Sequence, residues 1–156
     1  MLSHVDDQNR PRMVDVGAKP ATQRSARARC RVILGAAIMA RLQGGDIVAA
    51  KGPVFQTAIV AGTMACKRTS DLIPFCHPLA LDHCQISIAP ADAVSVQVEC
   101  RASLTARTGV EMEALTGAAV AALTIYDMCK AMSHDIVISD LQLVEKHGGK
   151  HDVVRA

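Results

Sequence analysis

Aromatic residues are nearly absent from this sequence, whose 156 residues include no Trp, one Tyr and two Phe. Half of the residues are nevertheless apolar, so the core has to consist of Val, Ile, Leu, Met and, above all, Ala. Small side chains allow backbones to approach closely, which favours helices packed against other helices or against another subunit. The scarcity of aromatics also removes the stacking platforms on which single-stranded nucleic acids bind.

A strong charge of either sign is also lacking, because the formal net charge at pH 7 is only +2. That charge is too small for nucleic-acid binding by bulk electrostatics, and we expect no nucleic-acid partner. A Walker motif for nucleoside phosphates is missing as well. Individual basic side chains can still bind a small anionic molecule.

Long hydrophobic runs and C-x-x-C pairs do not occur. Residues 16–45 carry one Lys, five Arg and no acid, as a targeting segment would. Their apolar run at 32–40 is too short to span a bilayer and follows a polar stretch, so we expect no membrane partner. The six cysteines are widely spaced, which is typical of reduced thiols acting as small apolar residues. We therefore expect a cytoplasmic protein.

Hydrophobic periodicity predicts one α+β domain. Alternation predicts strands at 23–35, 83–89, 94–104 and 136–144. A helical period predicts helices at 36–42, 52–67 and 110–132. Without the extra short helix the order is βαββαβ, a ferredoxin-like arrangement with helices on one face of a four-stranded antiparallel sheet. We expect a mobile N-terminal tail at 1–12, a single domain at 13–150 and a C-terminal tail at 151–156.

One basic residue stands where a helix is expected to begin. Lys51 precedes Gly52 and Pro53, and proline is favoured in the first turn of a helix. The helix dipole and the free backbone N–H groups of that turn attract anions, so Lys51 and these groups together could hold a phosphate. A solvated loop lysine explains the same residues and, taken alone, is the more common situation.

A second group lies in the loop at 67–79, where Cys76 and His77 are adjacent. Two prolines stiffen this loop, which makes it a suitable platform for a ligand. A half-buried histidine bonded to backbone is the alternative. A zinc site from Cys76, His77, His83 and Cys84 is a third interpretation, but adjacent residues point in different directions and the spacing matches no structural zinc pattern.

The third group lies on the longest predicted helix. Asp127 and Lys130 are three residues apart and therefore share one face. An ordinary surface ion pair, worth a few tenths of a kcal/mol, has the same spacing. Residues 118–126 are apolar nearly all round, however, which predicts a buried helix with partly desolvated charges near its end. Desolvation and an opposite charge together adjust the pKa of a carboxylate or lysine for proton transfer.

The same helix carries Glu113 near its start. Glu113 and Asp127 project within roughly 40° of one face but lie about 21 Å apart along the helix axis. No small substrate can contact both in one subunit. If both serve one site, a second subunit has to bring its helix alongside in the opposite sense, which the small residues of this helix permit. This spacing predicts a site shared across a two-fold axis.

Several blocks of the sequence together resemble a known family. The blocks are MVDVGAK, KGPVFQTA, KRTSDLIPFCHPL, TGVEMEALT and AALTIYDMCKA. They resemble the cyclic pyranopterin monophosphate synthase family, the molybdenum cofactor biosynthesis protein C, and the likeness extends over residues 13–150. It implies a ferredoxin-like catalytic domain, a lyase that converts 3′,8-cyclo-7,8-dihydro-GTP to cyclic pyranopterin monophosphate and releases pyrophosphate. It also implies a homohexamer, a trimer of dimers with active sites between subunits, and no cofactor or metal.

The resemblance also implies roles for particular residues. The implied catalytic residues are Lys51, Asp127 and Lys130. The implied substrate-binding residues are Arg24, Phe75, Cys76, His77, Glu111, Met112 and Glu113. Lysines suit a polyanionic substrate, and lysine, aspartate and histidine can provide the proton transfers of a ring opening and reclosure that needs no redox step. Phe75 replaces a usual Leu, and Ser70 stands where some relatives have Trp.

A function of another class fits the same fold. Ferredoxin-like domains often bind small molecules at subunit interfaces without catalysis, so a small-molecule-sensing module is the alternative to an enzyme. Replacing Lys51 or Asp127 would then weaken ligand binding without any turnover to lose.

Overall fold

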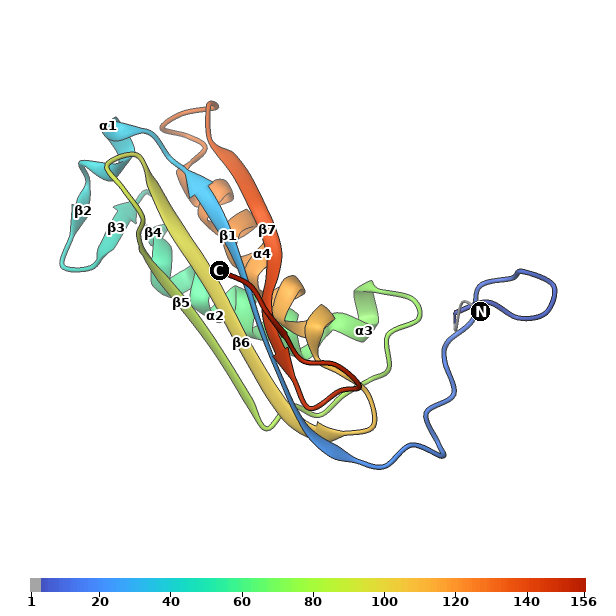
Figure 1. The fold of residues 1–156 in the computed structure, drawn as a ribbon. Helices are drawn as coiled ribbons and strands as arrows, with labels where there is room; N and C mark the ends of the chain where they lie inside the picture. The colour runs from blue at the N-terminus through green and yellow to red at the C-terminus, as the bar shows by residue number, and fades with distance from the viewer. Residues whose placement is uncertain (1–3) are drawn as a thin grey trace.

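The computed structural model describes residues 4–156, and its main layer is a five-stranded antiparallel sheet in the order β5-β6-β1-β7-β8. The strands are β1 (Thr22–Ile33), β5 (His83–Pro90), β6 (Ser95–Ala106), β7 (Val137–His147) and β8 (Val153–Val154). The long helices α2 (Val54–Lys67) and α4 (Glu111–Cys129) lie side by side behind this sheet (Figure 1). The fold is therefore α+β.

The alternation of small apolar and charged residues decides which face of the sheet the helices cover. The buried apolar side chains of the two central strands β1 and β6 are their even-numbered residues: Ala26, Ala28, Cys30, Val32, Val96, Val98, Cys100, Ala102 and Leu104. Arg27 is odd-numbered and lies on the opposite face. There its Nη1 atom lies 2.8 Å from Glu99 Oε2, and its Nη2 atom lies 3.1 Å from Glu145 Oε2. The arginine-rich stretch is thus a half-buried strand, as its alternation predicts.

Glycine lets the two long helices approach each other closely. A Cβ atom at residue 62 of α2 would lie 2.8 Å from the carbonyl oxygen of Gly117 and 3.0 Å from the Cβ atom of Ala121, both on α4. Larger side chains would separate the helices at this crossing. The core therefore uses small residues between its helices, in keeping with the scarcity of aromatics.

Short strands account for the main differences from the predicted architecture. The prediction of four strands was wrong, because residues 153–154 form β8 and pair with β7 within the expected C-terminal tail. A second antiparallel sheet, also not predicted, stands before α2. It consists of β2 (Leu42–Gln43), β3 (Asp46–Ala49) and β4 (Gly52–Pro53). Strands of two to four residues are too short for alternation to be recognised.

The remaining segments are short helices and loops. The short helices are α1 (Ala36–Met39) and α3 (Thr69–Leu72). The expected tail at 1–12 begins with residues 1–3, which lie outside the described residues. From residue 4 the chain forms a loop in which Val5 pairs with Pro11 and the N–H groups of Gln8 and Arg10 donate to the Asp6 carboxylate. Among residues 4–156, no helix has the length and hydropathy needed to cross a membrane.

Candidate active site

Three charged side chains meet at the C-terminal end of α4. Lys51 lies in the turn between β3 and β4, Asp127 lies in the last turn of α4, and Lys130 follows that helix. The Lys51 ammonium donates to Asp127 Oδ2 at 2.5 Å, and Lys130 Nζ lies 2.7 Å from Asp127 Oδ1. The structure thus brings all three predicted catalytic residues together in one cluster.

Asp46 of β3 holds the β3–β4 turn against the start of α2. Its Oδ1 accepts a hydrogen bond from the N–H of Phe55 at 2.7 Å, and its Oδ2 accepts one from the N–H of Gln56 at 3.1 Å. These N–H groups of the first helical turn are therefore occupied. Asp46 thus binds two of the N–H groups that the sequence offered to a phosphate, and Lys51 is paired with Asp127.

Solvent and ion pairing set the protonation of this cluster. The side chains of Lys51, Asp127 and Lys130 are 55%, 49% and 50% exposed. Hydrogen bonds from Lys130 and Lys51 lower the pKa of Asp127 to about 2, and the contact with Asp127 raises the pKa of Lys130. The expected desolvation was wrong for the single chain, because this end of α4 faces solvent. The Asp127 carboxyl group is therefore ionised at neutral pH.

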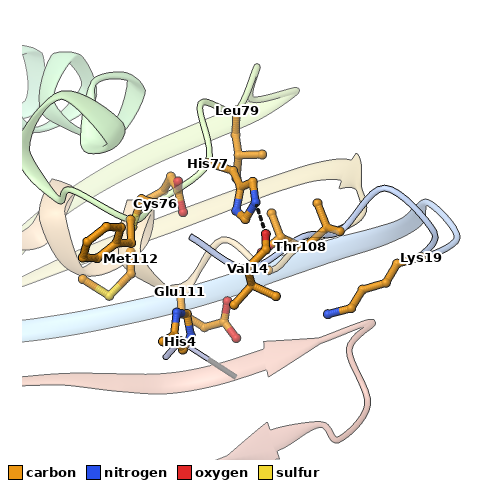
Figure 2. A pocket seen from close by; sticks show the side chains of 13 residues that line it. His4, Val14, Lys19, Cys76, His77, Leu79, Thr108, Glu111 and Met112 are labelled. Carbon is orange, nitrogen blue, oxygen red and sulfur yellow. Dashed lines mark hydrogen bonds between the residues drawn. The ribbon is translucent and has the colours of Figure 1, made fainter. Parts of the chain in front are cut away.

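The predicted substrate-binding residues gather around a cavity at the other end of α4. This cavity of about 240 Å³ lies between the segment before β1, the loop from α3 to β5 and the turn from β6 to α4. Figure 2 shows side chains from all three segments converging on it. Its lining includes the predicted residues Phe75, Cys76, His77, Glu111, Met112 and Glu113.

His77 ties two walls of this cavity together. Its Nε2 lies 2.8 Å from the carbonyl oxygen of Val14 (Figure 2), and since a carbonyl only accepts, this nitrogen carries the proton. The backbone-bonded histidine considered above is therefore present, and it also lines the cavity. Burial raises the pKa of the neighbouring Cys76 thiol, which keeps it neutral.

Two glutamates separated by one residue have different surroundings in this cavity. Glu113 is only 4% exposed, and burial raises the pKa of its carboxyl group. Glu111 is partly exposed, and its Oε1 accepts a hydrogen bond of 2.9 Å from the ammonium group of Lys146 on β7. The cavity thus offers one paired carboxylate and one buried carboxyl group that gains a proton more easily.

Arg24 is the one predicted binding residue that does not line this cavity. It lies on β1, and its Nε atom is buried with no hydrogen-bond partner in the described part of the chain. A Cβ atom at residue 149 would lie 3.0 Å from its terminal nitrogen, so the glycine there leaves room for the guanidinium. Conversely, Val14, Lys19 and Thr108 line the cavity but were not predicted, because nothing in their spacing marks them.

The cysteines and histidines of the zinc interpretation do not form a common metal-binding group among residues 4–156. The group of three potential metal ligands found there consists of Cys66, Cys84 and Cys100 instead. These cysteines come from three different elements, so spacing along the chain could not have identified them. One sign of their proximity was present in the sequence. Cys84 and Cys100 each fall on the alternating apolar positions of a predicted strand, which places both on the buried face of the sheet.

Known proteins resemble this chain over nearly its whole length. A model of the MoaC family matches residues 13–149. A cyclic pyranopterin monophosphate synthase from Xanthomonas campestris pv. campestris (strain B100) is 53% identical over 152 residues, which are 97% of this chain and 92% of that protein. A protein of the same name from Desulforapulum autotrophicum is 50% identical over 150 residues, 96% of this chain and 91% of its own length.

A longer protein contains a similar segment. The molybdenum cofactor biosynthesis bifunctional protein of Synechocystis sp. is 50% identical over 157 residues, which cover 98% of this chain and 45% of that protein. The matched residues include both ends of α4 and the loop that carries His77. The chain belongs to the MoaC family.

Proposed function

We propose that the protein is a cyclic pyranopterin monophosphate synthase, a lyase of molybdenum cofactor biosynthesis. The observation that carries this proposal is the cluster in which Lys51 and Lys130 both contact the Asp127 carboxylate. Two ammonium groups around one carboxylate suit a polyanionic substrate and proton transfer, and relatives that share half of the residues bear this name.

The proposed substrate is 3′,8-cyclo-7,8-dihydro-GTP, and the products are cyclic pyranopterin monophosphate and pyrophosphate. An ammonium group has three N–H donors, and the contact with Asp127 leaves further donors on Lys51 and Lys130 for phosphate oxygens. Both lysines are about half exposed, so a ligand can reach them. Charge complementarity of this kind replaces a phosphate-binding loop.

Proton transfer requires groups that change protonation near neutral pH. Asp127 is a weak base while its pKa is about 2, but bound substrate and a covering subunit would desolvate it and raise that pKa. Glu113 is already buried and has a raised pKa, which makes it a candidate to exchange a proton. His77, on the same cavity, is the further candidate donor.

We propose that each complete site combines the lysine cluster of one subunit with the cavity of another. The 19-residue helix α4 separates the two groups within one chain, since it is about 28 Å long. Exposed apolar side chains on the helices offer a surface for a second subunit: Val60, Met64 and Leu123. The full assembly that we propose is a homohexamer, a trimer of dimers.

The same proposal includes the finer description of the fold. A ferredoxin-like βαββαβ unit would consist of β1, α2, β5, β6, α4 and β7, with β8 and the small sheet as additions. The strand order β5-β6-β1-β7 and the antiparallel pairing support this description.

One assay tests the activity directly. The cyclic dihydro-GTP is supplied anaerobically to the full chain, and pyrophosphate and a fluorescent oxidised pterin are measured. We expect both products from the wild type and neither from Asp127→Asn. Binding of the substrate without any product from the wild type would refute the enzyme and identify the small-molecule-sensing module instead.

A further inference from the structure

Three cysteines from three separate elements converge inside the fold. Cys66 lies at the end of α2, Cys84 on β5 and Cys100 on β6. Their Sγ atoms all lie within 4.8 Å of one another, and all three are free thiols. None of them lines the cavity at the start of α4. The proposed synthase chemistry therefore assigns them no role.

The strand register explains why two of these thiols are neighbours. Cys84 pairs with Ala102, and Cys100 pairs with Ile86, so the two cysteines are diagonal neighbours on one face of the β5–β6 pair. That face is the one covered by the helices, and Cys66 points down onto it from α2 as a buried residue. The three sulfur atoms thus form a triangle between a helix and a sheet.

A glycine of α4 leaves room for this triangle. A Cβ atom at residue 117 would lie 2.6 Å from the Cys100 Sγ atom and 3.3 Å from the Cys66 Cβ atom. On its other side the triangle opens through Cys84, which is half-buried and lines a cavity of about 420 Å³ together with Thr63 and Lys67. Cys84 is therefore the thiol of the triangle that a small ion in this cavity can reach directly.

The size of the triangle suits one metal ion. Metal–thiolate bonds are about 2.3 Å long, so three sulfur atoms around one ion lie about 4 Å apart. From separations of at most 4.8 Å, each sulfur atom has to move by roughly half an ångström. Rotation about the side-chain torsions of the cysteines can provide such a movement.

The donor set selects the kind of ion. All three ligand atoms are sulfur, and no His, Asp or Glu side chain joins the group among residues 4–156. Soft thiolates favour monovalent copper and zinc, but structural zinc has four protein ligands, whereas monovalent copper is satisfied by three. Both Lys67 and Asp82 line the adjoining cavity, so charges of both signs lie at its walls.

We propose that Cys66, Cys84 and Cys100 form a three-thiolate site for one monovalent copper ion. Binding replaces three S–H bonds by three Cu–S bonds and releases three protons to solvent, and neither copper nor sulfur changes its oxidation state. The site is separate from the proposed synthase residues, so its test is a binding measurement that does not depend on turnover.

The experiment is an anaerobic titration of the full-length protein with monovalent copper against a chromophoric chelator such as bicinchoninate. We expect one tightly bound ion per chain in the wild type, and X-ray absorption with three Cu–S contacts. Cys84→Ser should weaken binding on the order of 100-fold or more, because it removes one ligand. This position is half-buried, so the variant should keep its fold, which circular dichroism checks.

The matched control is Cys30→Ser, which makes the same change at a buried cysteine outside the triangle. The Cys30 thiol lies 3.6 Å from the carbonyl oxygen of Ala118, and a hydroxyl can keep that contact. The Cys30→Ser variant should bind copper as tightly as the wild type. Four results would overturn the proposal: no competition by the wild type, unchanged affinity in Cys84→Ser, preference for zinc, or a disulfide among the three cysteines in protein purified without oxygen.

Discussion

Lys51 donates a hydrogen bond of 2.5 Å to Asp127, although 76 positions separate the two residues in the chain. The small sheet of β2, β3 and β4 makes this contact possible, because it carries the turn that holds Lys51 beside the end of α4. Asp46 anchors the same turn to α2 through two backbone N–H groups. Short strands that alternation cannot reveal therefore position a proposed catalytic group.

Lys51→Ala should abolish most of the synthase activity while the protein stays folded. Loss of a positioned proton donor costs about 10²- to 10⁴-fold in turnover. The pair with Asp127 is half exposed and screened by solvent, so its removal should change the free energy of unfolding little. Product formation and urea denaturation measure the two effects. Lys150→Ala, at an exposed lysine near the C-terminus, is the control and should keep full activity.

Asp127 should make stability depend on pH in the acid range. Its pKa is lowered from 3.8 to about 2 in the folded chain, so the carboxylate stabilises the fold above pH 4 and loses this effect as the pH falls toward 2. The difference in unfolding free energy between the wild type and Asp127→Asn should therefore shrink between pH 5 and pH 2, as followed by denaturant titration at each pH. A difference that stays constant over that range would contradict the ion pairing.

Removing the charge of Glu111 and removing that of Glu113 should change the melting temperature in opposite directions. Burial raises the pKa of Glu113, so the fold binds its proton more tightly than the unfolded chain does, and wild-type stability declines as the pH rises through that pKa. Glu113→Gln should remove this decline and raise the melting temperature at neutral pH. Glu111→Gln loses the contact with Lys146 and should lower the melting temperature slightly. Equal shifts in both variants would refute the difference in burial.

Arg27 should contribute more to stability than other arginines of the sheet. It bridges Glu99 and Glu145, and hydrogen bonds to these carboxylates raise the pKa of its guanidinium. Arg27→Ala leaves two partly buried carboxylates without their shared partner. This loss should lower the free energy of unfolding by about 2 kcal/mol. Arg101→Ala removes only a 55% exposed partner of Glu99 and should cost at most about 0.5 kcal/mol. Urea denaturation of both variants would test this order.

Mixed assemblies should recover activity if the two ends of α4 serve one site. Asp127→Ala and Glu113→Ala are each expected to be inactive. After the two variants are dissociated and reassembled together, half of randomly formed dimers contain both chains, and one of their two shared sites is intact, so about a quarter of wild-type activity should return. Absence of any recovery, with assembly confirmed by light scattering, would exclude a shared site.

The long elements were predictable because each carries a local pattern. Even-numbered apolar residues in β1 and β6 and a helical period in α2 and α4 repeat often enough to be recognised. The predicted ends differ from the observed ones by at most a few residues. β8 and the strands around Lys51 were missed because two to four residues contain too few repeats.

The sequence by itself determined the long elements, the family resemblance and the identity of the residues now found at both ends of α4. Only the tertiary structure decided that Lys51 and Lys130 share Asp127, that this cluster faces solvent, and that Cys66, Cys84 and Cys100 form one triangle. Periodicity reports which face of its own element a residue occupies. Distance, burial and pKa depend instead on neighbours that only the folded chain brings together.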